Sequence, residues 1–280
     1  MRISSLLASA ALAATLAVLA SPASAVPFTW NPSLTSPTAL SSAGAFTASN
    51  FTINDYALIN TTNPSAVTES AILSVQSFNT STPGLVSSSG TVGGAGSPYA
   101  LYFTVTATSH LAPSGPGLFG SFDTLSYTLW GDVGGNCSFS ASAAGPLASC
   151  GADTQLKLAT GGLSPTGPNQ VSIVGGIPSA AVDVTIVPST NAGGFFVSPS
   201  LLANFAFDTS FTNTLLEITQ QGPLFIIGGN TNCGSAQVPQ ACPGGGTIDL
   251  VTIPEPVTLS LFGAGLAGAA AMRRRKAKKA

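Results

Sequence analysis

The chain is poor in charged residues, and positive charge is the scarcest. Charged side chains make up 6% of the 280 residues, against roughly 25% in ordinary soluble domains. Six of the 8 Lys and Arg residues lie in the last eight positions, so residues 26–253 carry one cation, Lys157, against nine carboxylates. A body of this kind cannot neutralise a phosphate backbone, which argues against nucleic acid as a partner.

Histidine and cysteine are also scarce, which limits metal chemistry. His110 is the only histidine, and no Cys-x-x-Cys spacing occurs. We therefore expect no zinc site and no cofactor. The four cysteines form two local pairs in the sequence, Cys137 with Cys150 and Cys233 with Cys242, although four cysteines allow three connectivities. For an exported chain we predict the local connectivity, in which each disulfide closes a short loop.

No apolar run has the length of an ordinary transmembrane helix, and the two longest lie at the ends of the chain. Near the N-terminus, Arg2 precedes an apolar stretch of 14 residues, 6–19, and a small-residue cleavage site that contains Ala23 and Ala25. This pattern is typical of a secretory signal peptide. We therefore predict that residues 1–25 enter the Sec translocon as a signal helix and that signal peptidase removes them.

The C-terminal end, residues 252–280, combines three parts without a gap. In chain order they are the triplet Pro254, Glu255 and Pro256; an uncharged segment, residues 257–272; and a basic tail, residues 273–279, which begins with Arg273, Arg274, Arg275 and Lys276. As a helix the uncharged segment reaches about 24 Å, just short of a hydrocarbon core of about 30 Å. We expect a short transmembrane helix with transient residence in the inner membrane and a cytoplasmic basic tail.

This C-terminal arrangement resembles the PEP-CTERM sorting signal of Gram-negative bacteria that make exopolysaccharide. The same tail also goes under the name ice-binding protein C-terminal domain. The resemblance implies that exosortase, a membrane transpeptidase-like protease, recognises the Pro-Glu-Pro triplet and removes the tail during delivery to the cell surface. The alternative is a tail-anchored protein in which the triplet is only a linker.

Between the two ends, a two-residue periodicity predicts strands. In residues 101–108 (LYFTVTAT), apolar and polar side chains alternate as in a half-buried strand. Similar stretches are residues 71–78, 121–130, 171–174, 181–187, 201–207, 214–219, 224–227 and 247–253, and glycine-containing turns are expected between them at 131–132, 161–162, 193–194 and 228–230. Residues 26–251 are therefore predicted to form an all-β domain rich in Ser, Thr and Gly, an antiparallel β-sandwich or jelly roll.

Candidate chemistry in this body is sparse. Gly115–Gly120 has the G-x-G-x-x-G spacing, but nearby prolines and a following strand-like stretch favour a turn. His110 is expected just past a strand, without a catalytic role, because no Gly-x-Ser-x-Gly elbow occurs. Residues 131–136 offer two oxygen ligands for calcium, yet a hairpin turn is the preferred interpretation. We therefore expect no catalytic residues, no metal site and no enzyme activity.

The sequence predicts an exported structural protein of the cell surface or extracellular matrix, associated with exopolysaccharide. Residues 46–56 and 97–132 are similar to the flocculation-associated branch of PEP-CTERM proteins, which implies a role in floc or biofilm formation. The alternatives are a carbohydrate-binding or ice-binding module and, less favoured, a matrix hydrolase. The residues considered for the binding modules are the rings of Trp30, Tyr99, Tyr102, Tyr127 and Trp130, for which core positions are preferred, and the one-strand array Thr104, Thr106 and Thr108.

Overall fold

The architecture is almost entirely antiparallel β. The structure is a computed structural model that describes residues 27–40, 42, 44–79, 99–115, 117–165, 168–174, 179–191, 193–198, 205–213, 218–228 and 245–252. Within these ranges the helices are two single 3-10 turns, η1 (Pro32–Leu34) and η2 (Pro64–Ala66). The all-β prediction is confirmed, whereas the expected signal helix and C-terminal helix lie outside the described residues.

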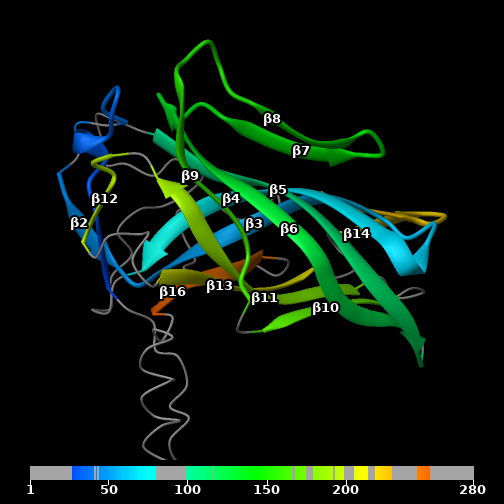
Figure 1. Cartoon of the computed structure of the whole chain (residues 1–280). Coiled ribbons are helices and arrows are strands. Elements are labelled where there is room, and N and C mark those ends of the chain that lie inside the picture. Colours follow the sequence, from blue (N-terminus) through cyan, green and yellow to red (C-terminus); the bar gives the residue numbers. More distant parts are fainter. Residues whose placement is uncertain are drawn as a thin grey trace, which may run out of the picture.

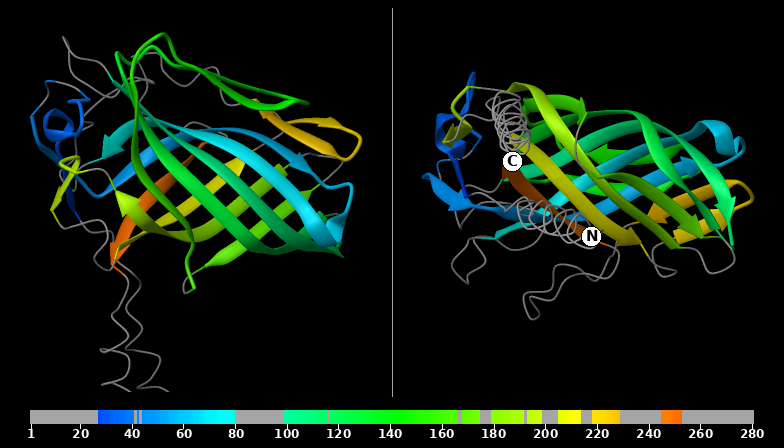
Figure 2. Two further views of the ribbon diagram at one scale, coloured as in Figure 1. Left: turned by 45° about the horizontal axis from the view of Figure 1, so that its top comes forward. Right: turned by 60° about the horizontal axis from the view of Figure 1, so that its bottom comes forward.

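One sheet of eleven strands closes on itself and forms most of the body (Figure 1). Its strands are β3 (Asn50–Asn60), β4 (Val67–Asn79), β5 (Tyr99–Ser114), β6 (Gly117–Val133), β9 (Gln155–Leu163), β10 (Asn169–Val174), β11 (Ser179–Asn191), β13 (Phe205–Asn213), β14 (Ile218–Gln221), β15 (Leu224–Gly228) and β16 (Gly245–Thr252). The ladder runs from β4 through β5, β6, β9 and β10, β11, β13 and β16 to β3, which pairs with β4 again. The sequence predicted a sandwich of two separate sheets packed face to face. In the structure the two facing layers belong to one sheet that closes on itself (Figure 2).

Alternation along the strands explains why the sheet closes around an apolar interior. In β3, the apolar side chains of Phe51, Ile53, Ala57 and Ile59 are buried, and most residues between them are only partly covered, although Asn54 and Asp55 are buried as well. The same two-residue period recurs in β5, where Leu101, Phe103, Val105 and Ala107 are buried. Where the structure describes them, the predicted strands are confirmed in kind, although β5 and β6 are much longer than the pattern indicated. Residues 201–204 and 214–217, which belong to two of the predicted strands, lie outside the described residues.

Two predicted turns are wrong. Gly131 lies inside β6, and Gly161 with Gly162 lies inside β9. At Gly161 a Cβ atom would collide with the backbone oxygen of Val187 and with the ring of Tyr127, so glycine is required there for close strand packing rather than for a turn. By contrast, Gly115 has φ +58° and joins β5 to β6, so the predicted turn is confirmed at Gly115, whereas Gly117 and Gly120 lie in β6.

Aromatic side chains fill one end of the closed sheet. A three-stranded sheet of β1 (Phe28–Trp30), β2 (Phe46–Ala48) and β12 (Phe196–Ser198) lies across that end (Figure 1). Trp30 is 1% exposed, and its ring centroid lies 4.9 Å from that of Phe78 and 5.9 Å from that of Phe51. The small sheet therefore closes the interior with ring packing of the kind that dominates core energetics.

A disulfide-linked hairpin covers part of the outer surface. β7 (Ser138–Ser142) and β8 (Gly145–Ser149) lie over β3 and β4 (Figures 1 and 2), and Cys137 is bonded to Cys150 at the open end of the hairpin. Phe139 packs on the rings of Tyr56 and Tyr102, with centroid distances of 5.8 and 5.4 Å. The local pairing predicted for Cys137 and Cys150 is confirmed, while Cys233 and Cys242 lie outside the described residues.

Candidate functional site

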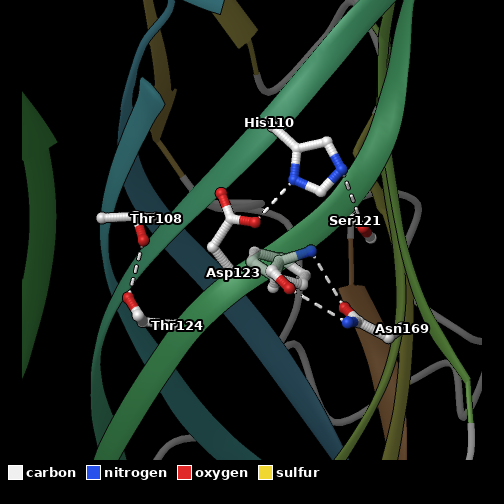
Figure 3. A network of polar contacts seen from close by, with 7 residues as sticks. Thr108, His110, Ser121, Asp123, Thr124 and Asn169 are labelled. Carbon is white, nitrogen blue, oxygen red and sulfur yellow. Dashed lines mark hydrogen bonds and ion pairs between the residues drawn. The ribbon is translucent and has the colours of Figure 1, made fainter. Parts of the chain in front are cut away.

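Three polar side chains meet on the outer face of β5 and β6 (Figure 3). His110 in β5 lies opposite Ser121 in β6, and Asp123 follows two residues later. Asp123 Oδ1 is 2.6 Å from His110 Nδ1, and Ser121 Oγ is 3.5 Å from His110 Nε2. The prediction that His110 follows a strand is wrong, because β5 continues past it to Ser114.

A β-bulge brings Asp123 into this cluster. The register changes from Thr108 opposite Thr124 to Ser109 opposite Phe122, so Asp123 is the extra residue of β6. A bulge turns a side chain out of the regular alternation, and here the carboxylate is directed at the imidazole (Figure 3). The strand pairing that creates the cluster was not visible in the sequence, since His110 and Asp123 are 13 residues apart.

The cluster has the connectivity of a Ser-His-Asp triad, in which the carboxylate orients the imidazole and the imidazole faces the hydroxyl. An acyl-transfer site also needs donors for the oxyanion, commonly the backbone N–H that follows the nucleophile. Here that group is occupied, because Phe122 N donates to Asn169 Oδ1 at 2.9 Å, and Asn169 Nδ2 donates back to Phe122 O at 3.0 Å (Figure 3). The side chains of His110 and Asp123 are 59% and 47% exposed. The arrangement is therefore a hydrogen-bonded surface cluster that lacks this oxyanion donor.

A shallow depression lies beside the cluster on the same outer face. It has a volume of about 330 Å³ and is lined by strands β6, β10, β11 and β13 through Phe119, Gly120, Gln170, Val171, Ser172, Ala181, Val182, Asp183 and Ser210. Phe119 is 44% exposed and is two residues from Ser121. Nothing in the sequence singled out this set, because it comes from four strands whose order the periodicity does not give.

Strand pairing determines which side chains of the depression lie side by side. Ser172 pairs with Phe119 and Gln170 pairs with Asp183, which in turn pairs with Ser210. Side chains at paired positions point to the same face of a sheet. The polar side chains Gln170, Asp183 and Ser210 therefore form a row across three strands, and Phe119 and Ser172 form the row next to it.

The aromatic rings considered for sugar stacking are mostly inside the protein. Trp30, Tyr99 and Tyr127 are at most 3% exposed, and Tyr102 lies under Phe139. Burial, and secondarily the charge of Asp132, raises the pKa of the Tyr102 hydroxyl to about 12. Trp130 is partly exposed, with Lys157 Nζ 5.6 Å from its ring centroid. The sequence-based preference for core positions is thus confirmed for the first four rings.

The threonine array of β5 continues onto β6. Thr104, Thr106 and Thr108 lie opposite Thr128, Ser126 and Thr124. Two of these pairs are hydrogen-bonded, Thr106 with Ser126 at 2.8 Å and Thr108 with Thr124 at 2.7 Å. These hydroxyls satisfy one another across the strands, which stabilises the sheet.

Of the two oxygen ligands considered for calcium in residues 131–136, one is buried and the other is hydrogen-bonded to neighbouring residues. Asp132 lies inside β6 and is fully buried, and burial raises its pKa. Asn136 instead accepts a hydrogen bond from Gly151 N at 2.9 Å and donates to Asp153 Oδ2 at 2.6 Å. The sulfurs of Cys137 and Cys150 lie near Asp132 but are joined in the disulfide.

The predicted processing sites lie outside the described residues. These are Ala23 and Ala25 at the signal cleavage site, Pro254, Glu255 and Pro256 of the triplet, and Arg273, Arg274, Arg275 and Lys276 of the basic tail. Among the described residues no helix has the length and apolar character needed to cross a membrane.

Comparison with protein families decides the role of the C-terminal end. Residues 252–276 match the family model described as PEP-CTERM protein-sorting motif. The chain carries a PEP-CTERM sorting motif. It is therefore an exported protein sorted through its C-terminus toward the cell surface, with exosortase as processing partner. No curated protein and no solved structure matches the chain.

Proposed function

We propose that this PEP-CTERM protein is a structural, non-catalytic component of the extracellular matrix, which associates with exopolysaccharide and supports biofilm or floc formation. The observation that supports the proposal is the sorting motif at residues 252–276, because it directs the body toward the cell surface, where an exopolysaccharide matrix would lie. On this proposal exosortase removes the basic tail, and the working protein is the closed β domain with its single cation, Lys157.

The body suits a matrix role in two respects. Its hairpin is fixed by the Cys137–Cys150 disulfide, which constrains the chain in an oxidising compartment. Its outer surface carries rows of uncharged hydroxyl groups on β5 and β6, which keep acceptor sites beyond the bonds between strands and can therefore bind hydrated polymers without attracting charged ones. The surface cluster also favours a matrix protein over a hydrolase. The backbone N–H of Phe122, which would serve as an oxyanion donor beside Ser121, already donates to Asn169.

Deletion of the gene tests the proposal, with settling rate and floc size as readouts. We expect slower settling and smaller flocs, and we expect the wild-type gene to restore both. Complementation with Ser121→Ala is the matched control for catalysis, and full restoration is the expected result. Normal flocs in the deletion strain would refute the matrix role, and failure of Ser121→Ala to restore them would favour the hydrolase alternative.

A further inference from the structure

Phe119 occupies an unusual position for a large apolar side chain. It lies near the start of β6, on the outer face of the sheet, and it is 44% exposed in the depression of β6, β10, β11 and β13. Phe122, three residues further along β6, is only 4% exposed. The same strand therefore buries one phenylalanine ring and leaves the other at the surface. Sites for small ligands are concave and combine apolar or aromatic side chains with a few polar groups that orient the ligand.

The polar side chains around Phe119 are available to a ligand. In the part of the chain that the structure describes, Gln170, Ser172, Asp183 and Ser210 form no hydrogen bond through their side chains. Together they offer an amide that donates and accepts, two hydroxyls that do both, and a carboxylate that only accepts. A ligand that fits this set must carry several hydroxyl groups and one apolar face for the ring.

Size and charge narrow the ligand further. The volume of about 330 Å³ is at the lower end of small-molecule sites, which suits a single sugar unit rather than a long groove. No cation lies among the residues that line the depression, and Asp183 gives it negative charge. Lys157 is on β9, where it contacts Trp130 at the other end of β6. An acidic sugar would therefore be repelled, while a neutral one would not.

We propose that the depression around Phe119 binds one sugar unit of a neutral polysaccharide. The apolar C–H face of the sugar lies on the Phe119 ring, and its hydroxyls bind Asp183, Gln170 and the two serines. This inference rests on the proposed function, since it names the class of matrix polymer that the protein contacts and the surface that contacts it.

Calorimetric titration of the purified full chain tests the site. The probes are the neutral oligosaccharides cellohexaose, maltohexaose and mannohexaose, with hexagalacturonate as the acidic comparison. We expect at least one neutral probe to bind and hexagalacturonate to bind at least tenfold more weakly. Phe119→Ala should weaken the binding of the neutral probe at least tenfold. Asp183→Asn should weaken it at least threefold and should reduce the difference in affinity between the neutral probe and hexagalacturonate.

A matched control separates the site from general surface effects. Leu147 on β8 is 61% exposed and lies outside the depression, so Leu147→Ala should leave binding unchanged. Equal binding by wild type, Phe119→Ala and Asp183→Asn would overturn the assignment, as would the absence of binding to all three neutral probes or tighter binding of hexagalacturonate. The proposed function fails separately, through normal flocs in the deletion strain, whatever the titrations show.

Discussion

Replacing Glu69 with glutamine should remove most of the pH dependence of stability between pH 5 and pH 8. Glu69 is on β4, and its side chain lines an interior cavity of about 30 Å³ whose other walls are almost entirely apolar. Burial, reinforced by the nearby charge of Asp55, raises the pKa of Glu69 from 4.5 to about 8. The folded protein therefore holds a proton on this carboxyl at a pH at which the unfolded chain has lost it.

The sign of the effect follows from this difference in proton binding. Below pH 4.5 the Glu69 carboxyl is mostly protonated in both the folded and the unfolded state, so it does not lower the free energy of unfolding. As the pH rises from 4.5 to about 8, the unfolded state gains the free energy of ionisation and the folded state does not, so stability falls. At about 1.36 kcal/mol per pKa unit, the loss approaches about 5 kcal/mol above pH 8 and is about 3 kcal/mol at pH 7.

The assay is guanidinium unfolding of the full chain, followed by tryptophan fluorescence at pH 5, 7 and 8.5. Wild type should be most stable at pH 5, and Glu69→Gln should be much less sensitive to pH. A dependence of the same sign should remain, because burial also raises the pKa of Asp132. Thr68→Ala, an exposed neighbour on the same strand, should behave like wild type. A Glu69→Gln variant with the full wild-type dependence would refute the reasoning.

Three further predictions concern the closed end, the hairpin and the surface cluster. Trp30→Ala should lower the free energy of unfolding by about 3 to 5 kcal/mol, because it empties the centre of the ring cluster; a loss below 1 kcal/mol in denaturant titration would contradict that packing. Replacing Cys137 and Cys150 together with alanine should cost about 3 kcal/mol and increase amide exchange in β7 and β8, whereas unchanged exchange would show that the disulfide does not fix the hairpin. A fluorophosphonate probe should leave Ser121 unlabelled, as in a His110→Ala control, because Phe122 N is already bonded; labelling that depends on His110 would establish a nucleophile.

Local patterns predicted much of the fold, and tertiary pairing accounts for the rest. The alternation in residues 101–108 was sufficient for a strand, since it depends only on which side chains face the interior. Closure of the sheet was not predictable, because it depends on β3 pairing with β4 on one side and with β15 and β16 on the other. Gly161 was misread as a turn, because the sequence does not show that Tyr127 packs against it.

The candidate sites divide in the same way. The sorting motif was predictable because its parts are contiguous, and the match at residues 252–276 confirms it. The contact of His110 with Asp123 requires a bulge in β6, and the depression around Phe119 requires the order of four strands. The sequence alone does not show these strand pairings, so it predicts neither the His110–Asp123 contact nor the depression around Phe119.

Sorting through the Pro-Glu-Pro triplet is the central claim, and the variant Glu255→Ala tests it most directly. The measurement is immunoblotting of membrane and surface fractions from exosortase-producing cells, which gives the size and the location of the protein. We expect that wild type reaches the surface without its tail, while Glu255→Ala accumulates in the membrane as a tail-bearing precursor. Normal trimming and surface delivery of Glu255→Ala would contradict it.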